Sequence, residues 1–260
     1  MKYIDIHGHV NFPKYDADRE AVIQRARDAG VGMLTVGTDV SSSREVVKIA
    51  EAHEGMWAIV GIHPTDAVDI TDADFSALQE SAAHPKVVAI GECGLDYFHS
   101  GPEDMEKQRS IFIKHIDLAN KLNKPLMLHV RNGKDSIHNA YQETIAILKE
   151  RSKVRANFHF FAGSLQDARD IVAMGNTVSF TGVLTFARNY DEIVRDVPLD
   201  SLMSETDCPY VAPIPYRGKR NEPTYVIEVV KKIAEIRGED VDTVATTVLQ
   251  NAHQFFGLLA

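Results

Sequence analysis

Short apolar runs rich in β-branched residues recur along the whole chain, and stretches with the apolar spacing of helices separate them. Eight runs predict strands, over Tyr3–His7, Met33–Thr38, Trp57–His63, Val87–Glu92, Pro125–Arg131, Ala156–Phe161, Thr177–Thr181 and Leu202–Asp207. The predicted helices cover Asp18–Ala29, Ser43–His53, Asp72–Ala83, Glu103–Asn123, Ser136–Arg151, Leu165–Met174, Glu222–Arg237 and Val241–Phe256. Alternating strands and helices are typical of a parallel α/β sheet, and eight strands favour closure into a (β/α)8 TIM barrel.

An open, doubly wound sheet is the alternative arrangement of the same elements. Such a sheet usually carries a glycine-rich phosphate loop after an early strand, and neither GxGxxG nor GxxxxGK[ST] occurs in this sequence. Barrels of this kind run to about 250 residues as one unit, which suits a chain of 260 residues. No repeat, low-complexity tract or linker divides the chain, so we expect a single domain over residues 1–260.

Composition excludes several classes of protein. With 44% hydrophobic and 25% charged residues, the chain has the composition of a globular protein. No apolar run approaches the roughly 20 residues of a membrane-spanning helix, and the first residues lack the apolar segment of a secretory signal. The chain has 2 cysteines, too few for a disulfide framework, so we expect a cytoplasmic protein. We also expect no membrane attachment, and a chain of this length can bury enough surface to fold without an obligate protein partner. A net charge of −9 means that any phosphate binding must be local.

Histidines and carboxylates gather at the carboxyl ends of the predicted strands. His7 and His9 lie at the end of the first strand, and residues two apart in a strand point to the same side. The fourth, fifth, sixth and eighth strands end with Glu92, His129, His159 and Asp207. Chance would scatter six such residues over strands and helices, whereas barrel enzymes assemble their sites at this end of the strands. We therefore predict that these six side chains bind metal.

Six nitrogen and oxygen ligands are more than one tetrahedral ion requires. Two divalent ions that share a bridging carboxylate would use all six, and Zn²⁺, Mn²⁺, Mg²⁺, Ni²⁺ and Fe²⁺ are all candidates. Glu92 is the best candidate for the bridge because it projects from a central strand. Asp207, a carboxylate on the last strand, is the candidate catalytic residue that orients a water molecule and accepts its proton.

The remaining histidines and the cysteines are expected to be structural for the most part. Five histidines lie on predicted helices or at their ends, namely His53, His84, His115, His138 and His253. His99 lies in a loop, where either role is open. Cys93 and Cys208 each follow a proposed ligand by one residue, so strand alternation turns them toward the helices. Asp5 is expected to face the same way as His7 and to hydrogen-bond a ligand imidazole.

These residues belong to motifs that resemble those of the TatD-type deoxyribonucleases, metal-dependent hydrolases of the amidohydrolase superfamily. The motifs occur in the family's order: HGH at 7–9, GIHP at 61–64, GECGLDY at 91–97, LHVRN at 128–132, HFFAGS at 159–164, ETDCPY at 205–210 and RGKRNEP at 217–223. The match extends to the NAHQFFGL segment near the C-terminus, and ETDxPY together with RGKxNEP is specific to this family.

The resemblance implies a distorted TIM barrel that hydrolyses DNA phosphodiester bonds with divalent metal, often as an exonuclease acting from the 3′ end. It implies the same six metal ligands, with a glutamate as the bridge, which matches Glu92. One motif departs from the family pattern, because HFFAG replaces the usual His-Cys-Phe-Ser-Gly. Phe160 is expected to point outward and to matter little, whereas Ala162 removes a hydroxyl and puts the substrate preference in question.

A phosphodiester substrate needs donor groups beside the metals. Arg131 lies two residues after His129 and shares its direction, so we expect it to contact a phosphate. The segment Arg217–Gly218–Lys219–Arg220 places three positive charges above the same end of the barrel, and we expect Arg217, Lys219 and Arg220 to bind substrate. His63 in GIHP is a further candidate for substrate binding. Tyr97 and Phe98 are candidates for base stacking or for packing.

The main hypothesis is therefore a metal-dependent phosphodiesterase that acts on DNA, on single strands or 3′ ends. A first alternative is an amidohydrolase-type C–N or ester hydrolase of a small metabolite, because the same metals would activate water against either electrophile. A second alternative is a metal-bound scaffold or nucleic-acid-binding protein without turnover. The cationic segment favours a phosphate substrate, and the complete ligand set favours catalysis.

Overall fold

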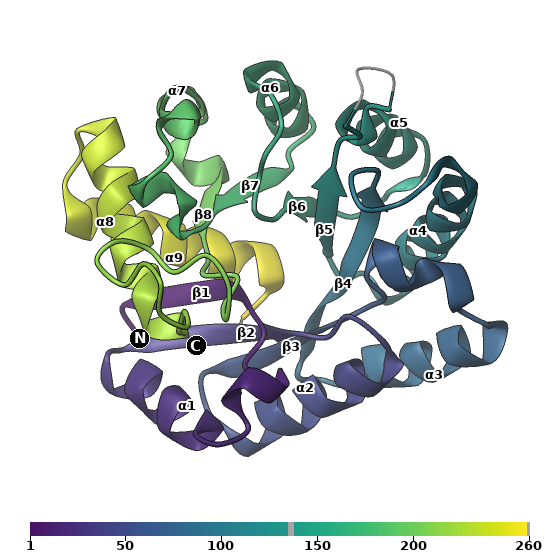
Figure 1. Cartoon of the computed structure of the whole chain (residues 1–260), viewed down its shortest axis with the longest axis horizontal. Coiled ribbons are helices and arrows are strands. Elements are labelled where there is room, and N and C mark those ends of the chain that lie inside the picture. Colours follow the sequence, from purple (N-terminus) through teal and green to yellow (C-terminus); the bar gives the residue numbers. More distant parts are fainter. Residues whose placement is uncertain (135–137, 259–260) are drawn as a thin grey trace.

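Eight parallel strands form one sheet, in which spatial order follows chain order (Figure 1). This arrangement comes from a computed structural model that describes residues 1–134 and 138–258. The strands are β1 (Tyr3–Gly8), β2 (Val31–Val36), β3 (Met56–Val60), β4 (Val87–Asp96), β5 (Leu126–Arg131), β6 (Ala156–Phe158), β7 (Thr177–Phe180) and β8 (Leu202–Ser204). The predicted barrel is confirmed, and the open doubly wound sheet is excluded because the strand order contains no reversal.

Helices surround the strands on the outside (Figure 1). They are α1 (Arg19–Asp28), α2 (Val40–Ala52), α3 (Asp72–Ala82), α4 (Pro102–Leu122), α5 (Ala140–Arg151), α6 (Leu165–Ala173), α7 (Asp191–Asp196), α8 (Val226–Arg237) and α9 (Val241–Phe256). Short 3-10 helices cover Pro13–Tyr15, Pro64–Asp69, Gly182–Thr185, Arg188–Tyr190, Leu199–Ser201 and Pro223–Tyr225. None of the helices within residues 1–134 and 138–258 is both long and apolar enough to cross a bilayer.

Polar side chains fix where several helices begin. Asp39, Thr71 and Ser164 open α2, α3 and α6 with capping boxes, in which the cap side chain accepts a hydrogen bond from the backbone N–H three residues on. Asn139 caps α5 in the same direction, so that this helix begins at Ala140. The predicted start at Ser136 lies outside the described residues. The sequence analysis missed α7, whose 6 residues are too few to display a helical period.

The barrel closes between β1 and β8 through a few polar contacts. The backbone N–H of Asp207 donates to the carbonyl of His7 at 2.9 Å. The carboxylate of Asp5 accepts from the backbone N–H of Thr206 at 2.8 Å and from its hydroxyl at 2.5 Å. Burial raises the pKa of Asp5 to about 8. This side chain therefore joins β1 to the segment that follows β8.

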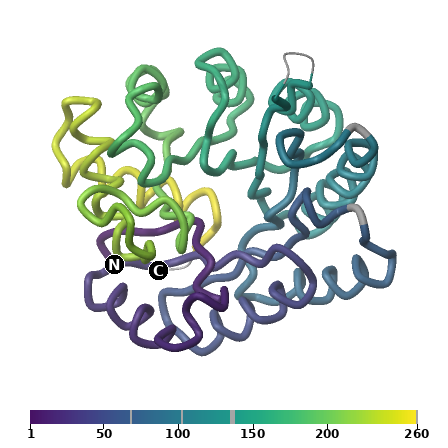
Figure 2. The backbone as a smooth tube through the Cα atoms, viewed as in Figure 1, coloured from purple at the N-terminus to yellow at the C-terminus, as the bar shows by residue number. Residues whose placement is uncertain are grey.

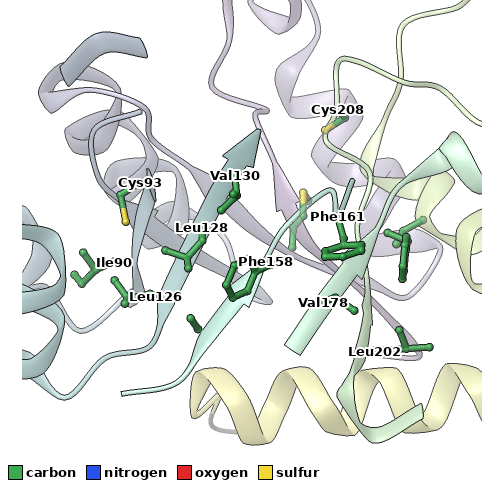
Figure 3. Close-up of a cluster of buried hydrophobic side chains, with 14 of the residues drawn as sticks. Ile90, Cys93, Leu126, Leu128, Val130, Phe158, Phe161, Val178, Leu202 and Cys208 are labelled. Atoms are coloured by element: carbon green, nitrogen blue, oxygen red, sulfur yellow. The ribbon is translucent and has the colours of Figure 1, made fainter. Parts of the chain in front are cut away.

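Two apolar layers lie on either side of the strands. The outer layer packs strands against helices and contains Cys93 and Cys208, as predicted; Figure 3 shows part of it. The inner layer fills the barrel with residues such as Ile4, Leu34 and Met127, and Phe255 of α9 belongs to it. Figure 2 shows the yellow C-terminal helix beside the purple first strand. We propose that the whole chain is one domain, because its last helix completes a core begun by its first strand.

β5 ends at the predicted Arg131, whereas the other seven strands end at a different residue, and the ends of β3, β4, β6 and β8 differ by three or four residues. β4 continues four residues beyond Glu92 and ends at Asp96, while β6 and β8 end at Phe158 and Ser204, before the ligands that were expected to end them. The pairing of β4 with β5 shifts between Ile90 and Cys93. Apolar composition locates a strand, but it does not reveal a bulge or the point where backbone pairing stops.

One helical histidine holds the loop beside the barrel mouth. His115 of α4 is fully buried, and its Nδ1 donates to the Ile111 carbonyl at 2.8 Å. Its Nε2 accepts a hydrogen bond at 3.1 Å from the backbone N–H of Ile62, the residue immediately before His63. The ring also meets Phe75 edge to face at 5.3 Å. The structural role expected for His115 is confirmed, because both ring nitrogens serve the backbone.

Burial of His115 makes the stability of the protein depend on pH. Burial lowers the pKa of His115 from 6.5 to about 4 in the folded chain. Its contribution to stability is therefore complete above pH 6.5 and is lost as the pH falls toward 4. We expect His115→Gln to reduce the loss of unfolding free energy over this interval by about 2–3 kcal/mol. Urea denaturation at successive pH values measures the difference.

His84→Gln is the matched control, because His84 lies at the surface beside Glu51. The comparison of the two variants shows which part of the change requires the buried imidazole of His115. Equal slopes for wild type and His115→Gln would contradict the assignment.

Candidate metal centre

A cavity of about 650 Å³ opens at the carboxyl ends of the strands. Its lining contains five of the six predicted metal ligands, which are His9, Glu92, His129, His159 and Asp207. The sixth, His7, is fully buried directly beneath them, with its Nε2 3.2 Å from Nε2 of His9. The structure thus brings together all six residues that the sequence placed at strand ends.

The carboxylate of Glu92 lies at the centre of the cluster, and its two oxygens face different histidines. Oε2 is 3.3 Å from Nε2 of His7 and 3.7 Å from Nε2 of His9. Oε1 is 2.8 Å from Nε2 of His159 and 3.0 Å from Nδ1 of His129. This is the division of oxygens that a bridging carboxylate requires.

The first donor set consists of His7, His9, Asp207 and Oε2 of Glu92. Asp207 Oδ1 lies 3.5 Å from Nε2 of His9 and 4.0 Å from Nε2 of His7. Ligands 2.0–2.1 Å from a tetrahedral ion stand roughly 3.3 Å apart. The separations in this set, from 3.2 to 4.0 Å, therefore surround a space that fits a divalent ion.

The second donor set consists of His129, His159 and Oε1 of Glu92. The ring nitrogens of the two histidines that face Glu92 are 3.4 Å apart. His63 lies beside this set, with its Nε2 3.6 Å from Oε1 of Glu92. The Thr65 backbone N–H donates to His63 Nδ1 at 3.3 Å, so the ring proton is on Nε2. His63 in this tautomer is a hydrogen-bond donor that faces the cavity.

Partners on the far side of each ring aim the ligands. His9 Nδ1 donates to the Val36 carbonyl at 3.0 Å, which leaves its Nε2 lone pair directed at the cluster. Asp96 Oδ2 lies 2.8 Å from Nε2 of His129 and so frees Nδ1 of that ring toward Glu92. Such carboxylate–histidine pairs fix the tautomer of a metal ligand.

Asp96 and Glu205 are two functional residues that the sequence analysis missed. Glu205 is fully buried, with Oε2 3.6 Å from Nδ1 of His159. Both acids lie inside the motifs GECGLDY and ETDCPY, two residues or more from the nearest proposed ligand. The signal in the sequence was that each of these acids lies in a motif that also contains a proposed ligand. The sequence analysis left the role of His99 open. His99 lines the cavity, and its Nδ1 lies 2.8 Å from Oδ2 of Asp96.

The cluster is electrostatically arranged for cations. Burial alone would raise the pKa values of Glu92 and Asp207, but the surrounding imidazoles lower both, that of Glu92 well below its usual range. Burial opposes a charge on His159, yet Glu92 and Glu205 raise its pKa to about 10. Burial and the neighbouring His129 lower the pKa of His63 to about 3. The carboxylates therefore stay charged and attract positive charge, while His63 stays neutral.

Residues in the left-handed backbone region gather around the cavity. Phe160, Asp207 and Val211 have φ values of 41°, 52° and 52°, and all three line it. Strain of this kind concentrates at functional sites because the surroundings must hold it in place. With this left-handed backbone, the carboxylate of Asp207 lies 3.5 Å from Nε2 of His9. The expectation that Phe160 points outward is wrong. β6 ends at Phe158, so strand alternation does not reach Phe160, and its ring lines the cavity.

The predicted substrate-binding residues divide into two groups. His63 and Arg131 line the cavity. Arg217, Lys219 and Arg220 are not among its described lining residues, so the expectation that they bind substrate stays a prediction. Arg220 makes two hydrogen bonds of 2.7 Å to the Asp18 carboxylate, which tie the loop after β8 to the loop after β1. The guanidinium of Arg217 lies 4.0 Å from the centre of the Phe186 ring.

Asp5 does not bond a ligand ring as expected. Its carboxylate accepts from Thr206 and from the backbone N–H of His7, at 3.3 Å in the latter case. The β1–β2 register shifts between Asp5 and Gly8, so strand alternation does not carry from Asp5 to His7. Among the described residues that line the cavity, none is one of the histidines predicted to be structural.

Known proteins resemble this chain over nearly its whole length. The family described as TatD related DNase matches residues 4–257. An uncharacterized metal-dependent hydrolase, YabD, of Bacillus subtilis is 38% identical over 258 residues, which cover 97% of this chain and 98% of that protein. The 3′-5′ ssDNA/RNA exonuclease TatD of Pantoea vagans is 36% identical over 265 residues, which cover 98% of this chain and 99% of that protein.

Solved structures give the same result. The crystal structure of YjjV, a TatD homologue from Escherichia coli, has a TM-score of 0.89 with 29% identity, and the alignment covers 99% of each chain. A hydrolase of the TatD family from Entamoeba histolytica shares the fold, with a TM-score of 0.86 at 20% identity over 98% of this chain and 97% of that one. With its family match and its near full-length relatives, the chain belongs to the TatD family of metal-dependent hydrolases.

Proposed function

We propose that this protein removes nucleotides from the 3′ ends of single-stranded DNA by hydrolysis at a centre of two divalent ions. The observation that carries the proposal is the division of the Glu92 carboxylate between two donor sets on the floor of an open cavity. Several relatives carry the name 3′-5′ ssDNA/RNA exonuclease, including one from Erwinia amylovora that is 34% identical over 265 residues.

The donor atoms suit two hard or borderline divalent ions, with Glu92 as the bridge. His7, His9 and Asp207 would hold one, and His129 and His159 the other; Zn²⁺, Mn²⁺, Mg²⁺, Ni²⁺ and Fe²⁺ all accept such ligands. Paired ions lower the pKa of a bound water toward neutrality and polarise the phosphoryl oxygens.

The residues of the chain supply the rest of the reaction. Asp207 is ionised and its side chain is 14% exposed to the cavity, so it can orient the attacking water and accept its proton. His63, neutral with its proton on Nε2, donates a hydrogen bond to a phosphate oxygen. Arg131 at the end of β5 lines the wall and binds the phosphate through its guanidinium.

A short contact with a strand end agrees with the charge of the protein. A net charge of −9 disfavours a long electrostatic contact with a duplex, whereas one arginine and one histidine beside a metal centre suffice for a single phosphate. All donor residues come from one chain, so we propose that the enzyme needs no obligate protein partner. Both cysteines are buried and unpaired, which supports a reducing compartment, and we propose the cytoplasm.

The first prediction concerns activity on a 5′-labelled single strand. Metal-stripped protein supplied separately with Mg²⁺, Mn²⁺ or Zn²⁺ is expected to shorten the strand from its 3′ end, which a denaturing gel displays as a ladder. Asp207→Ala is expected to lower the rate by at least about 100-fold, because the proton acceptor is lost. Asp200→Ala, at an exposed aspartate away from the cavity, serves as the matched control. Absence of cleavage with every metal would contradict the proposal.

A second prediction concerns metal stoichiometry. Calorimetric titration of the metal-stripped protein is expected to reveal two ions per chain. His129→Ala removes a ligand of one donor set only, so this variant should bind a single ion, while His84→Gln should still bind two. Ion concentrations of about 100 times Kd should also stabilise the folded chain by about 2.7 kcal/mol per site. One ion in the wild-type protein would refute the bridging role of Glu92.

A third prediction separates phosphate binding from loop anchoring. Arg131→Ala is expected to raise KM about 10-fold or more, with an unchanged melting temperature, because a charged hydrogen-bond donor to the phosphate is lost. Arg220→Ala is expected to lower the melting temperature, because it breaks the bidentate pair with Asp18. Arg169→Ala breaks a similar pair with Asp196 far from the cavity and is the control for that loss. A lower melting temperature for Arg131→Ala would count against the assignment.

A further inference from the structure

Two aromatic rings at the cavity wall each carry a positive charge over one face. The guanidinium of Arg131 lies 4.5 Å from the centre of the Phe160 ring. The ammonium of Lys14 lies 4.6 Å from the centre of the Tyr210 ring, which is 46% exposed. Both rings line the same cavity. Aromatic faces beside cations are the combination with which proteins bind single-stranded nucleic acid, the ring for the base and the cation for the backbone.

Each ring belongs to a residue that lies close in the sequence to a different donor set. Phe160 directly follows His159 of the second set, and Tyr210 lies three residues after Asp207 of the first. Phe12 extends the Tyr210 side, because its ring stacks on His9 at 4.5 Å and meets Tyr210 edge to face at 6.3 Å. A phosphate held between the two donor sets would therefore share its cavity with both aromatic rings, one adjoining each set in the sequence.

The backbone holds both rings in position. Phe160 has a φ of 41°, and its backbone N–H donates to the buried carboxylate of Glu205. Tyr210 is held by its N–H, which donates to the Asp207 carbonyl at 3.0 Å, and by its own carbonyl, which accepts from Asn221 at 2.6 Å. A left-handed conformation costs free energy for a phenylalanine, and the bond to Glu205 holds the residue in it, with its ring at the cavity wall.

We infer that Phe160 with Arg131, and Tyr210 with Lys14, are the two base-stacking subsites that flank the scissile phosphate of a single strand. This inference rests on the proposed function and specifies its substrate: a strand with an unpaired base on each side of the cleaved bond. Phe160 stands where the family pattern has a cysteine, so one of the two subsites is a property of this chain.

The test compares three 5′-labelled oligonucleotides of one sequence. One is intact, one lacks the base of the 3′-terminal nucleotide, and one lacks the base of the penultimate nucleotide. We expect loss of either base to lower kcat/KM of the wild-type enzyme for the first cleavage by about 5- to 100-fold. Phe160→Cys should be insensitive to base loss at one of the two positions, and Tyr210→Ala should be insensitive at the other.

The matched control is Phe186→Ala. Phe186 is 40% exposed and lies under the guanidinium of Arg217 at 4.0 Å, but it is not among the described lining residues of the cavity. This variant should respond to base loss like the wild type. The inference is overturned if Phe160→Cys and Tyr210→Ala lower the rates of all three oligonucleotides by one common factor.

A binding measurement separates this inference from the proposed function. Fluorescence anisotropy with the same oligonucleotides in EDTA requires no turnover. Weaker binding of the baseless strands by the wild type, with the difference reduced in Phe160→Cys, supports the stacking subsites even if no strand is ever cleaved. Cleavage of all three strands at equal rates, with equal binding, would preserve the nuclease and refute the subsites.

Discussion

The buried carboxylate of Glu92 is the group on which the architecture of this site depends. It is 3% exposed, and five imidazole rings present a nitrogen within 4 Å of it, those of His7, His9, His63, His129 and His159. A buried charge is costly unless positive charge and donors surround it. His159, whose pKa is raised to about 10, supplies one positive charge, and divalent ions between the rings and the carboxylates would supply more. The family membership of the chain and this electrostatic requirement both indicate a protein that depends on metal.

The rest of the barrel serves to bring donors to that carboxylate. The register shift in β1 lets His7 join His9 at the centre, and the extended β4 places Asp96 where it can aim His129. Below this polar layer the barrel is filled with apolar side chains, closed at the far end by α9. The low dielectric of that filling strengthens every charge interaction above it. Catalytic power at the mouth thus depends on apolar packing beneath it.

Features governed by local pattern could be predicted from the sequence, and features governed by contacts between loops could not. Strand order, and the convergence of the six side chains that we propose as metal ligands, follow from apolar runs and from the carboxyl ends of strands. Strand alternation, however, holds only within a regular strand, so it misplaced Asp5 at a register shift and Phe160 beyond a strand end. The pairing of Arg220 with Asp18 joins residues 202 positions apart. No local period contains such information, so the sequence could not show that Arg220 is paired with Asp18.

The residues that could be predicted from the sequence are those proposed to bind metal, and the residues that could not are mostly those of the loops around the cavity. The proposed metal ligands lie within the strands or within three residues of a strand end, so the barrel largely sets their positions. Recognition belongs to the loops, and a loop residue can change without moving a ligand. The HFFAG segment illustrates this, because the backbone N–H of Ala162 donates to the Tyr141 hydroxyl at 2.8 Å regardless of the side chain it carries. The bond to Tyr141 therefore holds the loop after His159 whatever the residue at 162, and a substitution in this loop can change the wall of the cavity, as Phe160 does, without moving His159.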